Sequence, residues 1–128
     1  METPEDLRYT EEHEWVRSEG STLVIGITDY AQSELGDIVY VELPQADTEV
    51  KMGAIFGTIE AVKTVSDLYS PVSGRIVEVN ETLKDLPETV NQEPYQTGWM
   101  IRVEPTDGSM PEKLMDAAGY RAHVGEDN

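Results

Sequence analysis

Residues 57–80 have the sequence GTIEAVKTVSDLYSPVSGRIVEVN. An apolar run ends at Val62, and a second run with strand character begins after Lys63 and leads into Pro71. We therefore predict strand, reversal and strand, with Lys63 at the tip of the hairpin. A lysine at such a tip is exposed and is held by main-chain bonds on both sides. Most turn lysines are simply solvated charges, so the position alone supports a chemical role only weakly.

Short strands between turn residues dominate the rest of the chain. Residues 14–17 and 22–27 form a predicted hairpin, and Leu23, Ile25 and Ile27 share one face at period two. We expect further strands at 37–43, 54–61, 75–79 and 99–104, and inward-facing side chains at Val39, Val41 and Leu43. The chain is therefore predicted to be mainly antiparallel β.

Helices are predicted to be few and short. Thr28 or Asp29 can cap a helix over 30–35, and Gly36 ends it. A weaker turn of helix is expected at 81–85.

A C-terminal helix is also expected, opened by Ser109, Pro111 and Glu112 and terminated by Gly119. The chain contains no Pro/Gly/Ser-rich run long enough to form a linker. We therefore expect residues 1–128 to form one domain, with a core over about 7–120 and a loose acidic tail at 125–128.

Composition excludes several classes of function. The chain has 26 acidic residues against nine Lys plus Arg, a net charge of −17, which argues against binding to nucleic acids or anionic membranes. Because there is no cysteine, disulfides, thiolate zinc sites and a thiol nucleophile are excluded. The acidic residues 1–15 do not resemble a targeting peptide, and no apolar run reaches membrane-spanning length. We expect a soluble cytoplasmic protein, or a matrix protein if it is a mature mitochondrial form.

Signals for a stand-alone enzyme are weak. Gly53 and Gly57 do not form a phosphate-binding loop, and Ser73 lacks a nucleophile-elbow motif. His13 and His123 lie far apart in the sequence, with no metal-ligand spacing around them. We therefore expect neither catalysis nor a metal site.

The stretch at 57–80 resembles the lipoylation hairpin of glycine cleavage H proteins, with its lysine followed by SDLYSPVSG and a strand ending in EVN. The segments HEWV, GITDYAQ, LGDIVYVELP and GW resemble other signatures of this family in the family's order, at 13–16, 26–32, 35–44 and 98–99. The resemblance extends from about Leu7 to Tyr120. The departures from the family's usual residues are Ala46-Asp47, Ala61 and Gln96.

Related carriers fit less well. Biotin carriers place methionines on both sides of the modified lysine, whereas Val62 and Thr64 flank Lys63. Lipoyl domains of 2-oxoacid dehydrogenases usually have Asp before the lysine and continue into an acyltransferase. A free-standing H protein therefore matches best.

The resemblance implies a lipoyl-domain-like barrel-sandwich hybrid, an antiparallel β-sandwich with short helices and a C-terminal helix. It implies lipoate in amide linkage to Lys63, with Glu60 and Gly74 read by the lipoylating enzyme. It further implies a cleft for the aminomethyl-bearing arm lined by Glu14 and Asp67, to which we add Glu12. Aromatic residues that could line the core or the cleft are Trp15, Tyr40, Phe56, Tyr95 and Trp99.

The implied function is that of a carrier that itself makes no bonds. It would take an aminomethyl group from a pyridoxal-phosphate glycine decarboxylase to a tetrahydrofolate-dependent aminomethyltransferase. A dihydrolipoyl dehydrogenase that uses FAD and NAD would then reoxidise the arm, and we expect the carrier to be a monomer. Two alternatives stay open at this point: an H-like lipoyl donor outside glycine cleavage, and an interaction domain that carries nothing.

Overall fold

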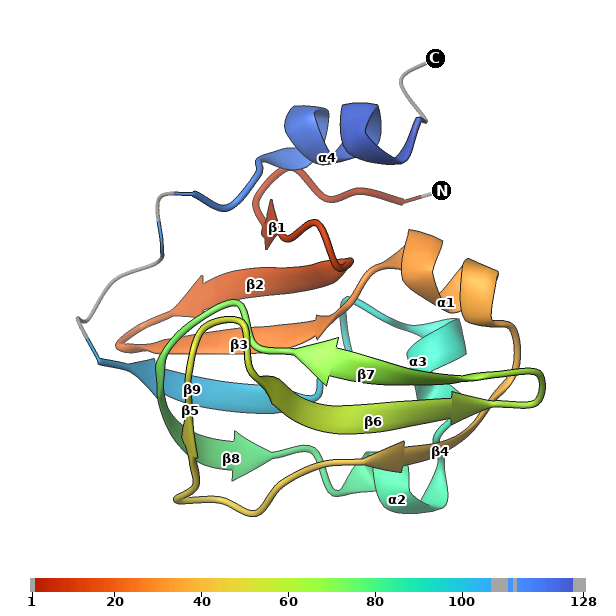
Figure 1. Ribbon diagram of the computed structural model, residues 1–128, viewed down its shortest axis with the longest axis horizontal. Helices are drawn as coiled ribbons and strands as arrows, with labels where there is room; N and C mark the ends of the chain where they lie inside the picture. The colour runs from red at the N-terminus through yellow and green to blue at the C-terminus, as the bar shows by residue number, and fades with distance from the viewer. Residues whose placement is uncertain (1, 107–110, 112, 126–128) are drawn as a thin grey trace.

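The predicted hairpins account for most of the computed structural model, which describes residues 2–106, 111 and 113–125 (Figure 1). The strands are β1 (Arg8–Tyr9), β2 (Glu14–Glu19), β3 (Thr22–Ile27), β4 (Ile38–Glu42), β5 (Glu49–Val50), β6 (Ile55–Ala61), β7 (Val65–Tyr69), β8 (Gly74–Val79) and β9 (Ile101–Pro105). The helices are α1 (Asp29–Leu35), α2 (Thr82–Asp85), α3 (Thr89–Gln92) and α4 (Ala117–Val124).

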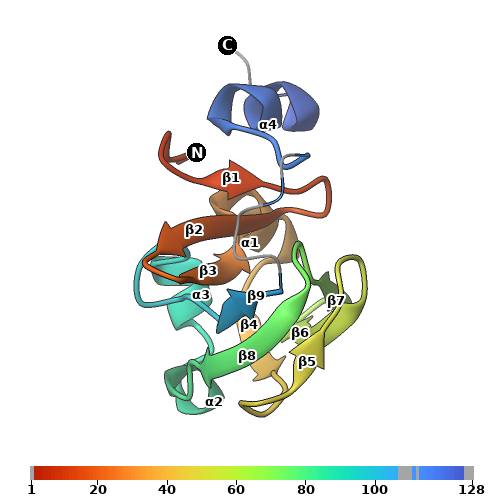
Figure 2. The same ribbon diagram turned by 90° about the vertical axis from the view of Figure 1, so that its left-hand side faces the viewer.

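These strands form two sheets in which neighbouring strands run antiparallel. The larger has the order β1-β2-β3-β9-β8-β5, and the smaller has the order β4-β6-β7. Figure 2 shows the larger sheet from one edge strand to the other, with α4 beyond β1 at one end of the molecule. The described strands close neither sheet into a barrel, so the fold is a mainly β sandwich with short helices, as predicted.

Side chains on the two faces of β3 belong to two different hydrophobic clusters. Leu23, Ile25 and Ile27 belong to the cluster that also takes residues from the smaller sheet, which confirms their shared face. Val24, on the other face, packs with Trp15 in a second cluster that α4 and the N-terminal segment cover. Both faces of β3 are therefore buried, which gives the larger sheet a fixed register.

The predicted orientation of β4 is wrong at Val39. The pairing of β4 with β6 shifts register between Ile38 and Tyr40, which is the signature of a β-bulge. The extra residue reverses the phase of alternation, so that Ile38 and Val41 are each 3% exposed, whereas Val39 and Tyr40 are each 49% exposed. Leu43 is partly buried against the core. Tyr40 is consequently a surface residue, unlike Trp15, Phe56 and Tyr95, which are buried.

The predicted C-terminal helix has the wrong boundaries. Ser109 and Glu112 lie outside the described residues, and the helix α4 starts after Asp116, whose side chain accepts a hydrogen bond from the Gly119 N–H. Gly119 therefore lies in the first turn, where an N-cap partner is needed, and does not terminate the helix. Gly125, with φ of 81° and ψ of 22°, provides the left-handed C-cap. Residues 126–128 of the expected loose tail also lie outside the description.

Candidate functional site

Lys63 lies at the tip of the β6–β7 hairpin, as predicted. Glu60 and Val65 are the last cross-strand pair, and the Ala61 N–H donates to the Thr64 carbonyl at 2.8 Å. The tip is exposed, and Val62 beside the lysine retains 70% of its accessible surface. Within the described part of the chain, no hydrogen bond or ion pair engages the Lys63 ammonium. Its amine is thus available for attachment of a group, on a support that main-chain bonds hold rigid.

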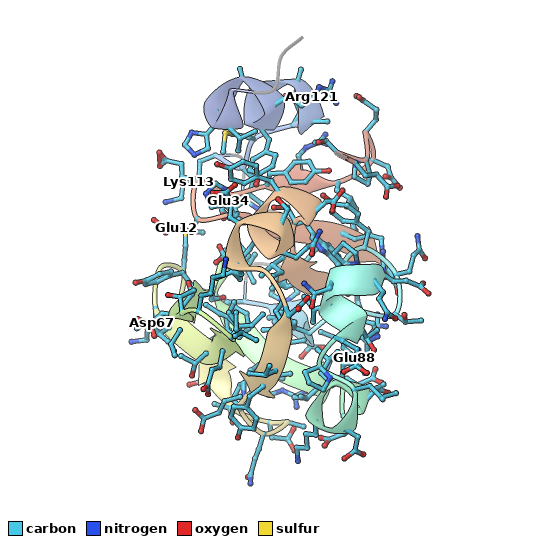
Figure 3. All side chains as sticks on the ribbon, turned by 90° about the vertical axis from the view of Figure 1, so that its right-hand side faces the viewer. Glu12, Glu34, Asp67, Glu88, Lys113 and Arg121 are labelled. Carbon is cyan, nitrogen blue, oxygen red and sulfur yellow. The ribbon has the colours of Figure 1, made fainter. Side chains whose placement is uncertain are left out.

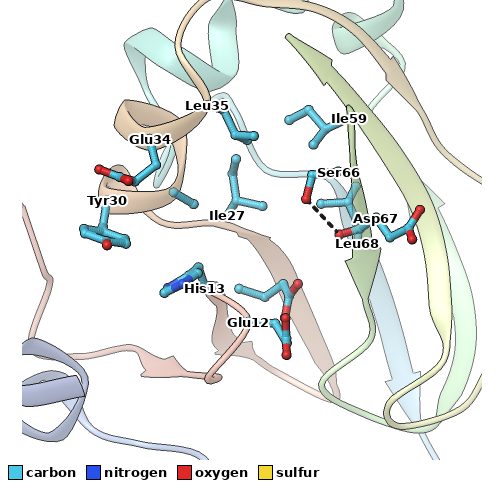
Figure 4. A pocket seen from close by; sticks show the side chains of 12 residues that line it. Glu12, His13, Ile27, Tyr30, Glu34, Leu35, Ile59, Ser66, Asp67 and Leu68 are labelled. Atoms are coloured by element: carbon cyan, nitrogen blue, oxygen red, sulfur yellow. Dashed lines mark hydrogen bonds between the residues drawn. The ribbon is translucent and has the colours of Figure 1, made fainter. Parts of the chain in front are cut away.

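A cleft of about 230 Å³ opens beside the same hairpin. Its walls come from the turn before β2, from α1 and from the inner side of β6 and β7 (Figure 4). The residues that line it are Glu12, His13, Glu14, Ile27, Tyr30, Ala31, Glu34, Leu35, Ile59, Ser66, Asp67 and Leu68. At roughly 3.3 Å per residue, Asp67 on β7 is about 13 Å along the strand from Lys63. An arm attached to the tip could therefore fold back along β7 into the cleft.

Helix α1 forms one wall of the cleft, and hydrogen bonds hold both of its ends in place. The Thr28 side chain accepts from the Ala31 N–H at 3.1 Å, and the Gly36 N–H donates back to the Gln32 carbonyl. This confirms the predicted helix and selects Thr28 as its N-cap. Asn91 on α3 holds the other end of α1, with its side-chain amide donating to Gln32 and to the Gly36 carbonyl.

Glu14 is a carboxyl group buried at the cleft wall, with 2% of its surface exposed. Its Oε1 accepts from the Thr10 hydroxyl at 2.7 Å, and its Oε2 accepts from the Tyr69 N–H at 3.2 Å. Burial raises the pKa of Glu14 to about 7, although both of these hydrogen bonds favour the charged form and oppose the rise. A cation that enters the cleft would shift this carboxyl toward its ionised state.

The other two acids predicted for the cleft are placed differently. Glu12 is exposed and lines the cleft at the turn before β2. Figure 3 shows Glu12 and Asp67 on the same side of the molecule. Asp67 contributes to the β7 wall, but its carboxylate points away from Ser66 and Leu68, which face inward (Figure 4). The structure therefore brings Glu12 and Glu14 to the cleft and directs the Asp67 carboxylate to the outer face of β7.

The two residues predicted to guide lipoylation lie in contrasting environments. Glu60 is exposed on the outer face of the smaller sheet, between its cross-strand partners Tyr40 and Val65. Gly74 is buried at the start of β8, between β5 and β9, and is not among the residues with positive φ. A Cβ there would overlap the Glu104 carbonyl and come within 2.8 Å of the Val103 side chain. Close approach of strands requires the glycine, and β8, which it begins, starts on the side of the molecule away from the turn between β6 and β7 (Figure 1).

Sequence reasoning missed the residues that shape the cleft from behind. Thr10 accepts from the Glu12 and Glu14 amides and donates to the Glu14 carboxyl, so that it fixes the turn. The hydroxyl of Tyr120 on α4 forms hydrogen bonds with the side chains of both His13 and Thr28. A threonine four residues before a glutamate is a weak signal, and the incorrect start of the C-terminal helix concealed the role of Tyr120.

Other kinds of site find little support. Among the described residues, no group of three or more His, Cys, Asp or Glu side chains is placed to hold a metal ion. None of the described helices has the length and apolar character needed to cross a membrane.

Comparison with known proteins gives a consistent result. The family model for the glycine cleavage H-protein matches residues 7–127. The chain is 58% identical over 126 residues to the glycine cleavage system H protein of Anaeromyxobacter sp. strain K, covering 98% of each chain. It is 58% identical over 127 residues to the corresponding protein of Bacillus licheniformis, covering 99% of this chain and all of the relative.

A solved structure agrees with these relatives. The crystal structure of a glycine cleavage system H protein from Mycobacterium marinum superposes with a TM-score of 0.87 at 41% identity, covering 95% of this chain and 98% of that one. These matches favour a carrier role within glycine cleavage over the lipoyl-donor alternative. The chain therefore belongs to the glycine cleavage H-protein family, and it is a non-catalytic lipoyl carrier of the glycine cleavage system.

Proposed function

We propose that Lys63 is the residue that bears lipoate, through an amide at Nζ. The observation that carries this proposal is an exposed lysine, with no partner among the described residues, at the tip of a hairpin that also forms a wall of the cleft. The residues fit the group, because the amine is accessible and the neighbouring cleft has apolar and acidic sides. When bound, lipoate supplies a dithiolane that accepts the aminomethyl group and leaves the arm reduced.

The cleft protects a cationic amine from water. Ile27, Leu35 and Leu68 provide apolar walls that exclude solvent, and Glu14 provides a buried carboxylate. Burying an ammonium without a partner costs several kcal/mol, which an adjacent carboxylate largely offsets. Glu12 adds negative potential at the cleft, and Asp67 adds it from the outer side of β7.

Recognition by the lipoylating enzyme depends on Glu60 directly and on Gly74 indirectly. Glu60 is exposed and is flanked across the sheet by Tyr40, 49% exposed, and Val65, 61% exposed. An enzyme approaching Lys63 meets this row, in which Glu60 and Val65 belong to the same hairpin and Tyr40 to the adjacent β4. Gly74 is buried, so it acts by permitting the close approach of β8 and β9.

The partners follow from this role. The carrier delivers its arm to a pyridoxal-phosphate glycine decarboxylase, a tetrahydrofolate-dependent aminomethyltransferase and a dihydrolipoyl dehydrogenase that uses FAD and NAD. A net charge of −17 favours transient docking to basic surfaces on these enzymes. Residues 1–128 act as one monomeric domain in the cytoplasm, or in the matrix for a mitochondrial form.

A Lys63→Arg variant tests the attachment site. Arginine keeps the positive charge but cannot form the amide under the conditions of lipoylation. We expect the variant to fold normally, to remain unmodified and to give no glycine decarboxylation exchange with the decarboxylase. Lys51→Arg, which changes another exposed lysine, is the matched control and should behave as the wild type. Normal exchange by Lys63→Arg would refute the proposal.

A second pair of variants tests the cleft. Glu14→Gln removes the buried charge, and Asp67→Asn removes the outward-pointing charge at nearly constant size. Both should still be lipoylated and loaded. Spontaneous release of formaldehyde and ammonia from the loaded Glu14→Gln protein should be about tenfold faster than from wild type, and the Asp67→Asn protein should show a smaller change. If both loaded variants decay at the wild-type rate, the cleft does not work through these carboxylates.

A further inference from the structure

The C-terminal helix α4 contributes none of the described lining residues of the cleft, yet one of its side chains joins both walls. The Tyr120 hydroxyl lies 2.8 Å from His13 Nδ1 and 2.8 Å from Thr28 Oγ1. His13 directly precedes Glu14 in one wall, and Thr28 caps α1, which forms the facing wall. Tyr120 is 1% exposed and Thr28 is fully buried, so water does not compete for these contacts.

The His13 turn needs such support. His13 has a φ of 74°, a backbone conformation that few residues other than glycine adopt without strain. The Thr28 N–H donates to the His13 carbonyl at 3.0 Å. The ring centroids of Tyr30 and the His13 imidazole are 5.0 Å apart. Because Glu14 follows directly, the conformation of His13 determines where the Glu14 side chain enters the wall.

Titratable groups from α1, α4 and the preceding turn surround His13. Tyr30 and Glu34 face it from α1, Tyr120 and His123 face it from α4, and Glu12 precedes it in the turn. Burial lowers the pKa of His13, and the neighbouring His123 lowers it further. The Tyr120 hydroxyl has one hydrogen to donate and two lone pairs to accept, so it can pair with His13 Nδ1 in either tautomer of the imidazole and with Thr28 Oγ1 in either direction. Thr28 still accepts from the Ala31 N–H, so every group in this chain of bonds has a partner.

We propose that Tyr120 is a positioning residue for the arm cleft, because its hydroxyl holds the His13–Glu14 turn against the first turn of α1. The inference rests on the proposed function of the cleft, but it assigns a new role to α4. The helix is a brace for a site that it does not line. Loss of the hydroxyl should loosen the two walls and expose the cargo's amine to water.

The neighbouring Tyr9 provides a matched control. Its ring stacks on Tyr120 at 4.7 Å, and its hydroxyl donates to the Pro4 carbonyl at 2.6 Å, away from the cleft. Tyr120→Phe and Tyr9→Phe each remove one hydroxyl from the same aromatic stack. Only the first removes the hydroxyl that joins the His13 imidazole to the Thr28 side chain.

Hydrogen exchange of the unloaded protein gives the first measurement. In Tyr120→Phe we expect the Thr28 and Ala31 amides to exchange about fivefold to tenfold faster, with exchange in β8 and β9 unchanged after correction for global stability. In Tyr9→Phe the exchange rates of these two amides should change only as much as the change in global stability requires. Equal acceleration in both variants would show that Tyr120 acts through overall stability, and the proposal would be overturned.

Release of formaldehyde and ammonia from the loaded protein gives the second measurement. It should be several-fold faster in Tyr120→Phe than in Tyr9→Phe. Thr28→Val removes the same side-chain hydrogen bond from the other side together with the N-cap of α1, so it should release at least as fast as Tyr120→Phe, whereas Thr28→Ser keeps the hydroxyl and should match wild type. If Thr28→Val releases at the wild-type rate, the link has no positioning role. Should Glu14→Gln also leave release unchanged, the proposed function of the cleft fails, while the exchange measurement still decides whether Tyr120 braces the walls.

Discussion

Glu14 shows how one residue can be both structurally costly and useful. A carboxyl with 2% exposure gives up its hydration, and the hydrogen bonds from Thr10 and Tyr69 replace it only in part. The result is a group poised near pH 7 that gains a partner when a cation enters. Because of the same desolvation cost, the free energy of unfolding of the unloaded protein depends on the ionisation of Glu14.

We predict that Glu14 makes the protein less stable as the pH rises from 5 to 8. Its pKa rises from 4.5 to about 7 on folding. Below pH 4.5 the group is protonated in both states and carries no penalty. Between these values the unfolded chain releases the proton that the folded protein retains, so stability falls until the pH passes 7. The loss is at most about 3 kcal/mol.

Urea denaturation at pH 5 and pH 8 measures this effect. The change in unfolding free energy between the two pH values should be smaller in Glu14→Gln than in wild type. Glu12→Gln, which alters an exposed neighbour, should retain the wild-type difference. An equal pH dependence in wild type and Glu14→Gln would mean that Glu14 ionises freely in the folded protein.

Gly74 gives a second prediction for a single residue. A side chain there meets the Glu104 carbonyl and the Pro105 Cα, and neither can move without shifting β9. Gly74→Val should therefore lower the free energy of unfolding by about 3 kcal/mol, as overpacking does. Chemical denaturation checks this, and a loss below about 0.5 kcal/mol would show that the sheet accommodates the side chain.

At the scale of elements, the sequence predicted what local signals determine. The β6–β7 hairpin and α1 were predicted correctly, because alternation and a threonine cap act over a few residues. The β4 bulge was not, because Val39 and Ile38 are equally apolar and only pairing with β6 decides which is inward. The end of the C-terminal helix was predicted at Gly119, whereas Gly125 forms the C-cap. The Asp116 cap, which depends on where the chain leaves the sheet, decided between them.

The hairpin carries its own prediction. Its strands are held by cross-strand pairs and by the Ala61–Thr64 bond, none of which uses the Lys63 side chain. Lys63→Ala should therefore change the free energy of unfolding by no more than about 0.5 kcal/mol, as Lys51→Ala should. Equilibrium denaturation of the three proteins compares them. Strong destabilisation by Lys63→Ala would make the lysine a structural residue of the tip.

At the scale of the whole molecule, the two sheets have different roles. The larger sheet buries both faces of β3 and is covered by α4, whereas the smaller sheet presents its hairpin, Lys63 and the outer row around Glu60 to solvent. The family resemblance implied a sandwich, and the sequence pattern placed Lys63 at an exposed hairpin tip. It could not indicate that the C-terminal helix lies behind the cleft, because that contact joins residues more than a hundred positions apart.

We expect Lys63 to be the only lysine that carries the arm. The chain has four lysines, Lys51, Lys63, Lys84 and Lys113, so peptide mapping by mass spectrometry can assign the modification without ambiguity. The protein should be produced in a host supplied with lipoate and active in lipoylation, and each lysine-containing peptide should be examined. We predict lipoate on the peptide that contains Lys63 and on no other. Lipoate on Lys51, Lys84 or Lys113, or on no lysine under these conditions, would contradict the account.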